Sequence, residues 1–416
     1  MQKSVNLILL WLFVISTLGF CHNRVDFQAL SSFTYQLQDL NLEAVGEAGF
    51  DLVIMDYSSE GDDESAYTAH EINTLKNSPG GPKMVLSYLS IGEAEDYRFY
   101  WQENWKPGNP QWLDQVNPYW EGNYKVRYWD PEWQDIIFSY LDRILSAGFD
   151  GVYLDIIDAY ETYLYFSSVQ ASLEMVNFVQ SIREYIRPKN ENFLIFVQNA
   201  AELATMHPIY LNAVDGIGQE DIYFGYDSDG EPTPVTVTEE MQTNLDVFLN
   251  AGKLVLTVDY PFSESEDVPH FDQTTLNKIE NAYNKSRIRG YIPYCTVRNL
   301  NYLTINPGYE PTSIEEAGQA KFFHLTQNYP NPFNQQTVIN YQLPVRQTDG
   351  GSSTACWVRI QVFDILGREV DVLVDEMQTV GYYKVYWNAS TVPSGIYFYQ
   401  ITAGAFKAVR KMGLVK

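Results

Sequence analysis

The chain contains few residues of the types that bind metals, and this scarcity limits the chemistry open to it. It has five histidines and three cysteines (Cys21, Cys295 and Cys356), and the cysteines lie far apart in the sequence. Such spacing forms neither a zinc-ligand motif nor a disulfide framework, although one disulfide pairing stays open. No His-x-His or His-Glu-x-x-His motif is present. We therefore expect no metal and no cofactor, which argues against a zinc or two-metal hydrolase.

Long hydrophobic runs are also scarce, and only the N-terminus has one. Lys3 precedes an apolar segment, residues 5–15, that is shorter than the ~20 residues of a membrane span. A charged start followed by a short apolar segment is typical of an export signal, so we predict a signal peptide over residues 1–22. Cys21 leaves a lipidated form open, although the bulky Phe20 stands before it. We predict no stable membrane span.

Basic residues are few relative to acidic ones, and they are unevenly distributed. The net charge is -26, with -29 in residues 1–320 and +3 from Lys321 onward. This asymmetry indicates two modules. A field this negative repels nucleic acid, which we exclude as a partner, and attracts polycations. An equally good interpretation is that the acidity keeps an exported protein soluble.

The first module alternates short apolar runs with longer amphipathic segments. Residues 133–147 and 173–186 show the helical spacing of apolar residues most clearly. Eight strand–helix units predict a (β/α)8 TIM barrel, and no Gly-x-Gly-x-x-Gly or P-loop motif supports a doubly wound sheet instead. The expected strands are Ser32–Leu37, Leu52–Tyr57, Met84–Ser90, Gly151–Asp155, Phe193–Gln198, Gly216–Gln219, Leu254–Asp259 and Gly290–Tyr294.

Polar and aromatic residues gather where these strands end, which is the rim on which TIM barrels carry their active sites. The candidate site residues are Asp56, Tyr57, Tyr88, Glu93, Asp155, Gln198, Asn199, Glu220, Asp259, Tyr260, Tyr294 and Arg298. Capping of strand ends is an equally good interpretation for Asp56 and Asp259. We interpret Asp150 as structural and Asp158 as a loop residue. Asp155 and Glu220 are the best-placed pair to flank a glycosidic bond, since such a reaction needs two carboxyl groups.

The connection after the third strand, residues 93–130, is longer than an ordinary strand–helix loop. We interpret it as a wall of a substrate groove rather than a packed cover, because tryptophans gather in and next to it. They are Trp101, Trp105, Trp112, Trp120, Trp129 and Trp133. The acidic loop 58–64 lacks calcium-loop spacing, so we interpret it as a solvated turn.

Several segments resemble glycoside hydrolase family 114 over roughly residues 30–305. They are Leu52–Ser58, Val85–Arg98, Phe149–Asp155, Glu220 and Pro293–Leu300. The resemblance implies a TIM barrel with endo-acting cleavage of α-1,4-linked galactosamine polymers. It implies Asp155 and Glu220 as the catalytic acids, with Asp155 as general acid and Glu220 as nucleophile or base, or with these roles exchanged. It also implies a cationic polysaccharide substrate. A non-catalytic glycan-binding or adhesive protein on the same barrel is the alternative.

After a predicted linker, residues 306–321, the sequence changes to short alternating strands with Gly and Pro turns. This pattern predicts a small all-β sandwich over 322–416. The segments Gln327–Asn334, Asp364–Glu369 and Lys411–Lys416 resemble the type A C-terminal sorting domain of the type IX secretion system. The resemblance implies the type IX secretion machinery as a partner. It also implies a secreted or cell-surface location in a Gram-negative bacterium.

Overall fold

The computed structural model describes most of the chain. The described residues are 30–165, 170–263, 268–311, 324–325, 328, 331–343, 346–348, 351–353, 355–379, 381–404 and 406–416. The proposed signal peptide, with Cys21, and residues 312–321 of the proposed linker lie outside these ranges.

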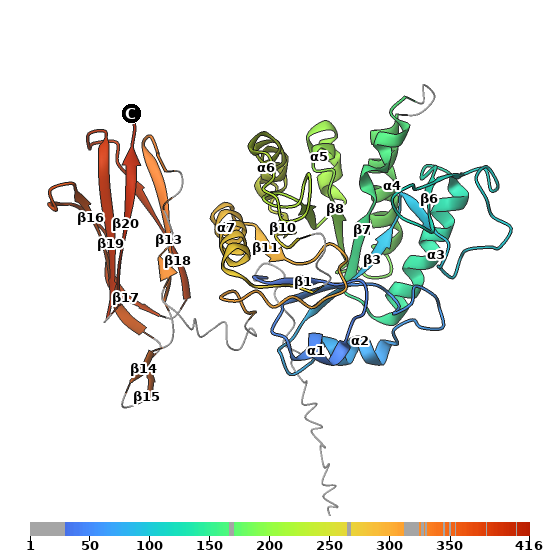
Figure 1. Ribbon diagram of the computed structural model, residues 1–416, viewed down its shortest axis with the longest axis horizontal. Helices are drawn as coiled ribbons and strands as arrows, with labels where there is room; N and C mark the ends of the chain where they lie inside the picture. Colours follow the sequence, from blue (N-terminus) through green and yellow to red (C-terminus); the bar gives the residue numbers. More distant parts are fainter. Residues whose placement is uncertain are drawn as a thin grey trace, which may run out of the picture.

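Eight parallel strands form one sheet whose order follows the chain (Figure 1). They are β1 (Phe33–Tyr35), β2 (Leu52–Met55), β3 (Met84–Ser90), β7 (Gly151–Asp155), β8 (Leu194–Gln198), β9 (Gly216–Glu220), β10 (Leu254–Asp259) and β11 (Ile292–Cys295). The first and last strands meet through side chains, since Thr34 Oγ1 donates to Tyr294 Oη at 3.0 Å. The predicted (β/α)8 barrel is therefore confirmed.

Helices connect the strands on the outside. They are α1 (Leu42–Glu47), α2 (Ala69–Lys76), α3 (Pro131–Ala147), α4 (Ala171–Ile186), α5 (Glu202–Met206), α6 (Val235–Asn250) and α7 (Gln273–Arg289), with 3-10 helices η2 (Ile157–Tyr163) and η3 (Pro208–Asn212). Helix α3 shows why the sequence sets these bounds. Asp130 caps its first turn by accepting from Glu132 N at 2.9 Å, and the left-handed Gly148 (φ 83°) ends it.

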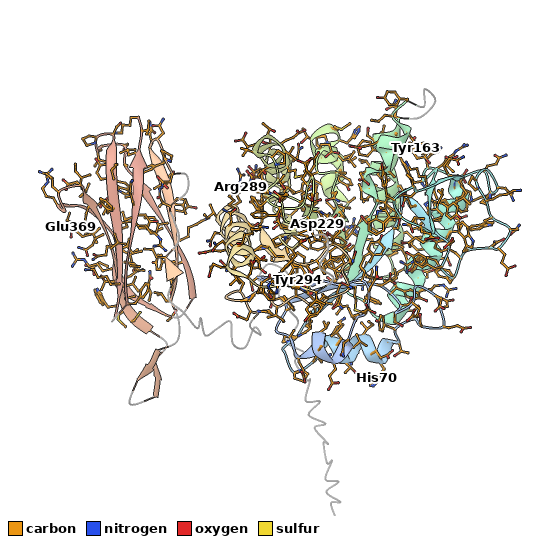
Figure 2. All side chains as sticks on the ribbon, viewed as in Figure 1. His70, Tyr163, Asp229, Arg289, Tyr294 and Glu369 are labelled. Atoms are coloured by element: carbon orange, nitrogen blue, oxygen red, sulfur yellow. The ribbon has the colours of Figure 1, made fainter. Side chains whose placement is uncertain are left out.

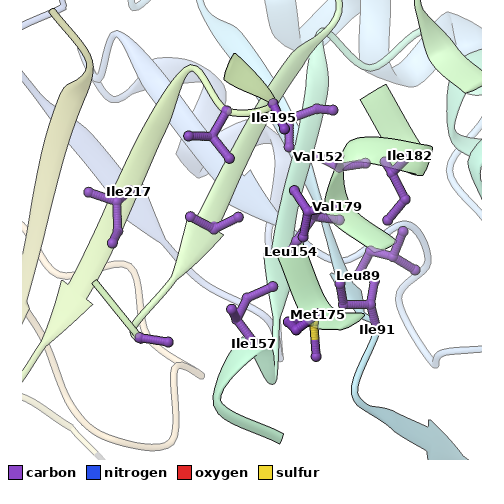
Figure 3. Packing of buried hydrophobic residues seen from close by; sticks show 14 of the residues in the cluster. Leu89, Ile91, Val152, Leu154, Ile157, Met175, Val179, Ile182, Ile195 and Ile217 are labelled. Atoms are coloured by element: carbon purple, nitrogen blue, oxygen red, sulfur yellow. The ribbon is translucent and has the colours of Figure 1, made fainter. Parts of the chain in front are cut away.

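The outer face of the barrel sheet packs against the helices. Figure 3 shows Val152 and Leu154 of β7 and Ile195 of β8 facing Val179 and Ile182 of α4. All five side chains are fully buried. Because both faces of a parallel sheet are covered, its strands read as continuous apolar runs, and this made them predictable from the sequence.

The interior of the barrel is filled by a second apolar cluster rich in aromatic rings. Tyr35, Tyr153, Phe196 and Tyr294 belong to it, and Figure 2 labels Tyr294 there. Strand β9 makes room for two of these rings with glycine. A Cβ at Gly218 would lie 1.7 Å from Tyr153 Oη. Another at the nearby Gly216 would lie 2.2 Å from the Phe196 ring, so β9 can carry no side chain at either position.

Three aspartates fasten the opposite rim, where the strands begin. Each lies one residue before its own strand. Its carboxylate accepts a hydrogen bond from a backbone N–H of the neighbouring strand, or of the residue just before that strand. Asp51 accepts from Ser32 at 3.1 Å, Asp150 from Val85 at 3.0 Å and Asp215 from Ile195 at 2.8 Å. Asp150 has the structural place that we inferred from the sequence.

The connection after β3 contains a small antiparallel sheet rather than an irregular loop. Its strands are β4 (Glu93–Glu95), β5 (Leu113–Val116) and β6 (Asn123–Val126), in the order β4-β6-β5. This sheet follows directly from β3, so it lies on the same rim as the strand ends.

The C-terminal region forms antiparallel sheets around its own apolar core. One sheet contains β12 (His324–Leu325), β13 (Gln336–Leu343) and β18 (Gly381–Asn388). The other contains β17 (Glu369–Thr379), β16 (Ala355–Asp364), β19 (Gly395–Ala403) and β20 (Phe406–Leu414). A hairpin of β14 (Arg346–Thr348) and β15 (Gly351–Ser353) lies between β13 and β16 in the chain. Buried Ile339, Val358 and Trp387 belong to the core, which confirms the predicted all-β region.

None of the helices in the described part of the chain is long and apolar enough to cross a lipid bilayer.

Candidate active site

Three neighbouring strands end in polar side chains at one rim. Asp155 is the last residue of β7, Gln198 of β8 and Glu220 of β9. Strand β8 pairs with both neighbours in parallel, so the three carboxyl-terminal ends meet. The structure therefore brings Asp155 and Glu220 to the same rim, with Gln198 on the strand between them.

The backbone turns sharply just beyond each of these residues. Ile156 (φ 56°), Asn199 (φ 58°) and Asp221 (φ 60°) are left-handed although none is glycine. This conformation is unfavourable for a β-branched residue such as Ile156, and such strain is concentrated at functional sites. Gly92 makes the first turn possible, because a Cβ there would lie 2.1 Å from Ile156 O.

Three hydrogen-bond donors converge on the carboxylate of Glu220. The hydroxyl of Tyr260 donates to Oε1, while Gln198 Nε2 at 2.5 Å and Asn199 Nδ2 at 3.1 Å donate to Oε2. Asn199 is itself oriented, since its Oδ1 accepts from Gln219 Nε2 at 3.0 Å. Donors of this kind stabilise the negative charge of the carboxylate.

Asp155 has a different environment. Its side chain is partly buried, and its Oδ2 accepts from Tyr88 Oη at 2.9 Å. The backbone N–H of Ile156 also donates to this carboxyl group. Burial, followed by the negative charge of Glu220, raises the pKa of Asp155 from 3.8 to about 8. At neutral pH this carboxyl group therefore holds a proton. Two carboxyl groups whose surroundings separate their protonation states can act as an acid and a base in one reaction.

Arg298 organises the rim beyond Glu220. Its guanidinium lies 3.8 Å from the centroid of the Tyr260 ring and donates to Asp221 at 2.8 and 3.1 Å and to Asp229 at 2.7 Å. A cavity of about 400 Å³ opens beside it. The cavity is lined by Gly225, Asp227, Ser228, Asp229, Tyr260, Phe262, Ser263, Thr296, Val297, Arg298 and Asn299.

On the β2–β4 side of the rim, Asp56 belongs to a buried ion cluster. Its two carboxylate oxygens accept from Arg98 at 2.8 and 2.7 Å. Arg98 is 4% exposed, and its Nε donates to Glu95 at 2.6 Å. Because this guanidinium occupies both oxygens of Asp56, the structure gives Asp56 an ion-pairing role.

Tyr57 and Glu93 are likewise engaged by protein partners. Buried Tyr57 donates to Asp63 at 2.5 Å. Glu93 is 4% exposed and accepts from Asn117 at 2.9 Å and Asn123 at 3.3 Å. Within the described ranges, no hydrogen bond links either residue to Asp155 or Glu220.

Asp259 and Tyr294 lie below the surface of the rim. Asp259 is fully buried, and its Oδ1 accepts from the backbone N–H groups of Tyr223 and Phe224 at 2.6 and 2.9 Å. It therefore fixes the loop that follows Glu220, which matches the capping interpretation. Tyr294 is fully buried in the barrel interior, and its oxygen accepts from Thr304 N at 3.1 Å.

Sequence reasoning missed two residues that hold the rim together. Arg98 belongs to the segment on which the family resemblance rests, and its place among acidic residues was the available signal. Tyr35 lies in the short run 32–37 and gave no signal. Its hydroxyl donates to Gln198 Oε1 at 3.0 Å from the far side of the barrel, a contact that only the closed sheet creates.

The tryptophans of the long connection mostly form a packed cover, which corrects our interpretation of a groove wall. Trp105 and Trp112 have ring centroids 5.0 Å apart, and those of Trp112 and Trp133 are 5.1 Å apart. Trp112 is 2% exposed and Trp133 is fully buried. Trp120, at 54% exposed, is the member that faces solvent. Aromatic content did not distinguish packing from binding because tryptophan serves both.

The acidic loop 58–64 is an ordinary turn held by the residue that follows it and by an ion pair with helix α3. Asp62 accepts from Ser65 N at 2.9 Å, and Asp63 pairs with Arg143. Across the part of the chain that the structure describes, no group of three or more His, Cys, Asp or Glu side chains could hold a metal ion.

A TIM barrel that carries two carboxyl groups at its carboxyl-terminal rim has the arrangement that glycoside hydrolysis needs. A family model described as glycoside-hydrolase family GH114 matches residues 21–310, and one described as a secretion system C-terminal sorting domain matches residues 327–414. The chain belongs to glycoside hydrolase family GH114. Its sorting domain assigns it to type IX secretion, and hence to export or display at the cell surface.

Relatives in distant organisms share the barrel. An uncharacterised protein of Methanocaldococcus jannaschii is 39% identical over 267 residues, covering 63% of this chain and 74% of that protein. Another, of Thermotoga maritima, is 33% identical over 287 residues, covering 67% and 84%. The glycoside hydrolase domain of PelA from Pseudomonas aeruginosa has a similar fold, with a TM-score of 0.50 and 13% identity over 67% of this chain and 98% of that one.

Proposed function

We propose that this protein is an endo-acting glycosidase that cleaves α-1,4-linked galactosamine-type polysaccharide outside the cell. The observation that carries the proposal is the contrast between the two carboxyl groups at the rim. Asp155 holds a proton because burial and Glu220 raise its pKa to about 8. Glu220 accepts from three donors that stabilise its charge.

The contrast suggests a role for each group. Asp155 donates its proton to the glycosidic oxygen while the bond from that oxygen to the anomeric carbon breaks. The carboxylate of Glu220 stabilises the positive charge that develops on the sugar, and attacks the anomeric carbon or activates the attacking water.

The charge of the rim supports an amino sugar as substrate. The carboxyl groups of Asp158 and Asp221 lie close enough to Glu220 for its negative charge to raise the pKa of each. Arg298 lies on this side, and Asp221 and Asp229 form ion pairs with it. The remaining negative charge favours a sugar with an ammonium group, and residues 1–320 carry a net -29 that attracts a cationic polymer.

The test measures reducing ends released from α-1,4-linked galactosamine polymer by the full chain. We expect wild type to cleave internal bonds, and Asp155→Asn and Glu220→Gln to lose about 10²–10⁴-fold in rate. Asp135→Asn, on the exposed face of α3, is the matched control and should retain activity. If the polymer binds but wild type and Glu220→Gln release no reducing ends, the non-catalytic glycan-binding alternative replaces this proposal.

We also propose the domain division in which residues 1–22 are a signal peptide, 30–305 the barrel, 306–321 a linker and 322–416 the sorting domain. The type IX system implies the two membranes of a Gram-negative cell. N-terminal sequencing of the exported protein tests the first boundary, and limited proteolysis tests the linker. Cleavage that begins within the barrel rather than at 306–321 would contradict this division.

A further inference from the structure

Tyr35 lies beneath the rim, on β1, and its side chain is almost completely buried. Its ring packs on Tyr153 with centroids 5.3 Å apart, and its hydroxyl donates to Gln198 Oε1 at 3.0 Å. Gln198 in turn donates from Nε2 to Glu220 Oε2 at 2.5 Å. A chain of two hydrogen bonds therefore runs from the barrel interior to the candidate catalytic carboxylate.

The direction of this chain follows from the chemistry of its ends. An ionised carboxylate only accepts hydrogen bonds, so the amide of Gln198 must present its NH₂ group to Glu220. Its carbonyl oxygen then points into the barrel, where Tyr35 is the one donor that reaches it among the described residues. A neutral phenol supplies that proton. Burial, with added repulsion from nearby Asp155, keeps Tyr35 neutral by raising its pKa well above the ordinary value.

We infer that Tyr35 is a positioning residue that fixes the amide of Gln198 in the orientation that donates to Glu220. This inference rests on the proposed function of Glu220. Without the Tyr35 hydroxyl, the carbonyl of Gln198 is buried without a partner, and a buried unpaired acceptor costs about 1–3 kcal/mol. Rotation of the Gln198 amide would let its oxygen find another donor, but it would move the NH₂ group away from Glu220. A fully reversed amide would place its oxygen against the carboxylate of Glu220, which repels it.

Tyr153 provides a matched control in the same layer. It has the same ring, belongs to the same interior cluster and contacts Tyr35 directly. Its hydroxyl is fully buried and makes no hydrogen bond. Tyr153→Phe therefore removes a buried hydroxyl near the site without removing a donor to Gln198.

Several charged and titratable groups face Glu220, so the effect of Tyr35 on the pH profile must be separated from the effects of the others. They are Tyr35 of β1, Asp155 and Tyr153 of β7, Asp158 of η2, Asp221 of the following loop and Tyr260 after β10. Tyr35→Phe leaves the rest of this set in place. A change seen in Tyr35→Phe and absent from Tyr153→Phe therefore reports the bond to Gln198.

The kinetic test uses the full chain and galactosamine polymer. We expect Tyr35→Phe to lower kcat about tenfold with KM changed less than twofold, and to move the acid limb of the pH profile to higher pH. Tyr153→Phe should retain the kcat and the acid limb of wild type. Gln198→Met should lower kcat as Tyr35→Phe does. The double variant should have the kcat of Gln198→Met alone, because both substitutions break the same series of hydrogen bonds from Tyr35 to Glu220. Additive effects, or an unmoved acid limb, overturn the inference.

A second test needs no substrate, so it stays informative if the proposed activity fails. The side-chain NH₂ signals of Gln198 can be assigned in NMR spectra of the free protein by their loss in Gln198→Met. We expect these protons to exchange with water at least tenfold faster in Tyr35→Phe than in wild type or Tyr153→Phe. Equal exchange in all three proteins would overturn the positioning role whatever the protein hydrolyses.

Discussion

The hydroxyl of Tyr88 donates to Asp155 at 2.9 Å, from the strand that pairs with β7. The two residues lie on neighbouring strands of the same rim, and the bond favours the charged form of Asp155. It therefore partly offsets the burial that raises the pKa of Asp155 to about 8.

A general acid must be protonated, so activity should fall as the pH rises through about 8, the pKa of Asp155. Removing the Tyr88 hydroxyl removes a contact that lowers this pKa. We expect Tyr88→Phe to move the alkaline limb of the kcat/KM profile to higher pH, by about half a unit to one unit for a bond of about 1 kcal/mol. A limb that moves to lower pH would contradict this assignment.

Asp155→Asn should make stability less dependent on pH. In wild type the carboxyl group stays protonated in the folded chain up to about 8, whereas an unfolded aspartate ionises near its ordinary value of 3.8. Stability from this group is present below that value and is lost as the pH rises toward 8. The variant lacks this loss, so its Tm relative to wild type should rise between pH 4 and pH 8. Thermal unfolding followed by circular dichroism checks it, with Asp135→Asn as control.

Hydrolysis of a cationic galactosamine polymer should slow as salt is added. The acidic barrel attracts such a polymer over distances that salt screens, with a Debye length of about 8 Å at 0.15 M. We expect kcat/KM to fall several-fold between 20 and 300 mM NaCl, conditions chosen to span this range. A fully N-acetylated polymer is the neutral control. Equal salt dependence for both polymers would remove the electrostatic argument for the substrate.

Gly218→Ala should destabilise the barrel. The added Cβ would lie 1.7 Å from Tyr153 Oη, so either the strand or the ring must move. Overpacking of this kind costs about 1–3 kcal/mol or more. Combining the change with Tyr153→Phe removes the nearest clashing atom and should recover part of the loss. Urea unfolding of the four proteins measures this coupling, and additive effects would contradict the steric explanation.

The packed and exposed tryptophans of the long connection should respond differently. Trp112→Ala removes a ring that is 2% exposed, and a buried tryptophan truncation costs about 3–5 kcal/mol. Trp120, at 54% exposed, should change stability by less than about 0.5 kcal/mol when replaced by alanine. Urea unfolding of both variants tests this. A large loss in Trp120→Ala would show that its ring is part of the cover.

The sequence predicted most of the barrel, because its strands read as apolar runs and its helices as periodic ones. Helices α3 and α4, expected from residues 133 and 173, begin at Pro131 and Ala171. Asp155 could be selected because it ends such a run, and Glu220 because it follows the expected strand Gly216–Gln219 and matches the family resemblance. What the sequence could not show was which polar residues the fold would use for itself. Asp259 and Asp56 follow strands in the same way, yet a loop backbone and Arg98 occupy them. The contact of Tyr35 with Gln198 joins residues 163 positions apart and depends on the closure of the sheet.

The aromatic interior of the barrel determines where a substrate can enter and where products can leave. Tyr35, Tyr153, Phe196 and Tyr294 fill the space between the strands, so the barrel has no bore along which a polymer could be threaded. Under the proposed function, a polysaccharide lies across the mouth of the barrel, and both new ends leave by the face at which the intact polymer bound. The endo-acting cleavage that we propose fits this arrangement, because a polymer lying across the mouth need not present a free end.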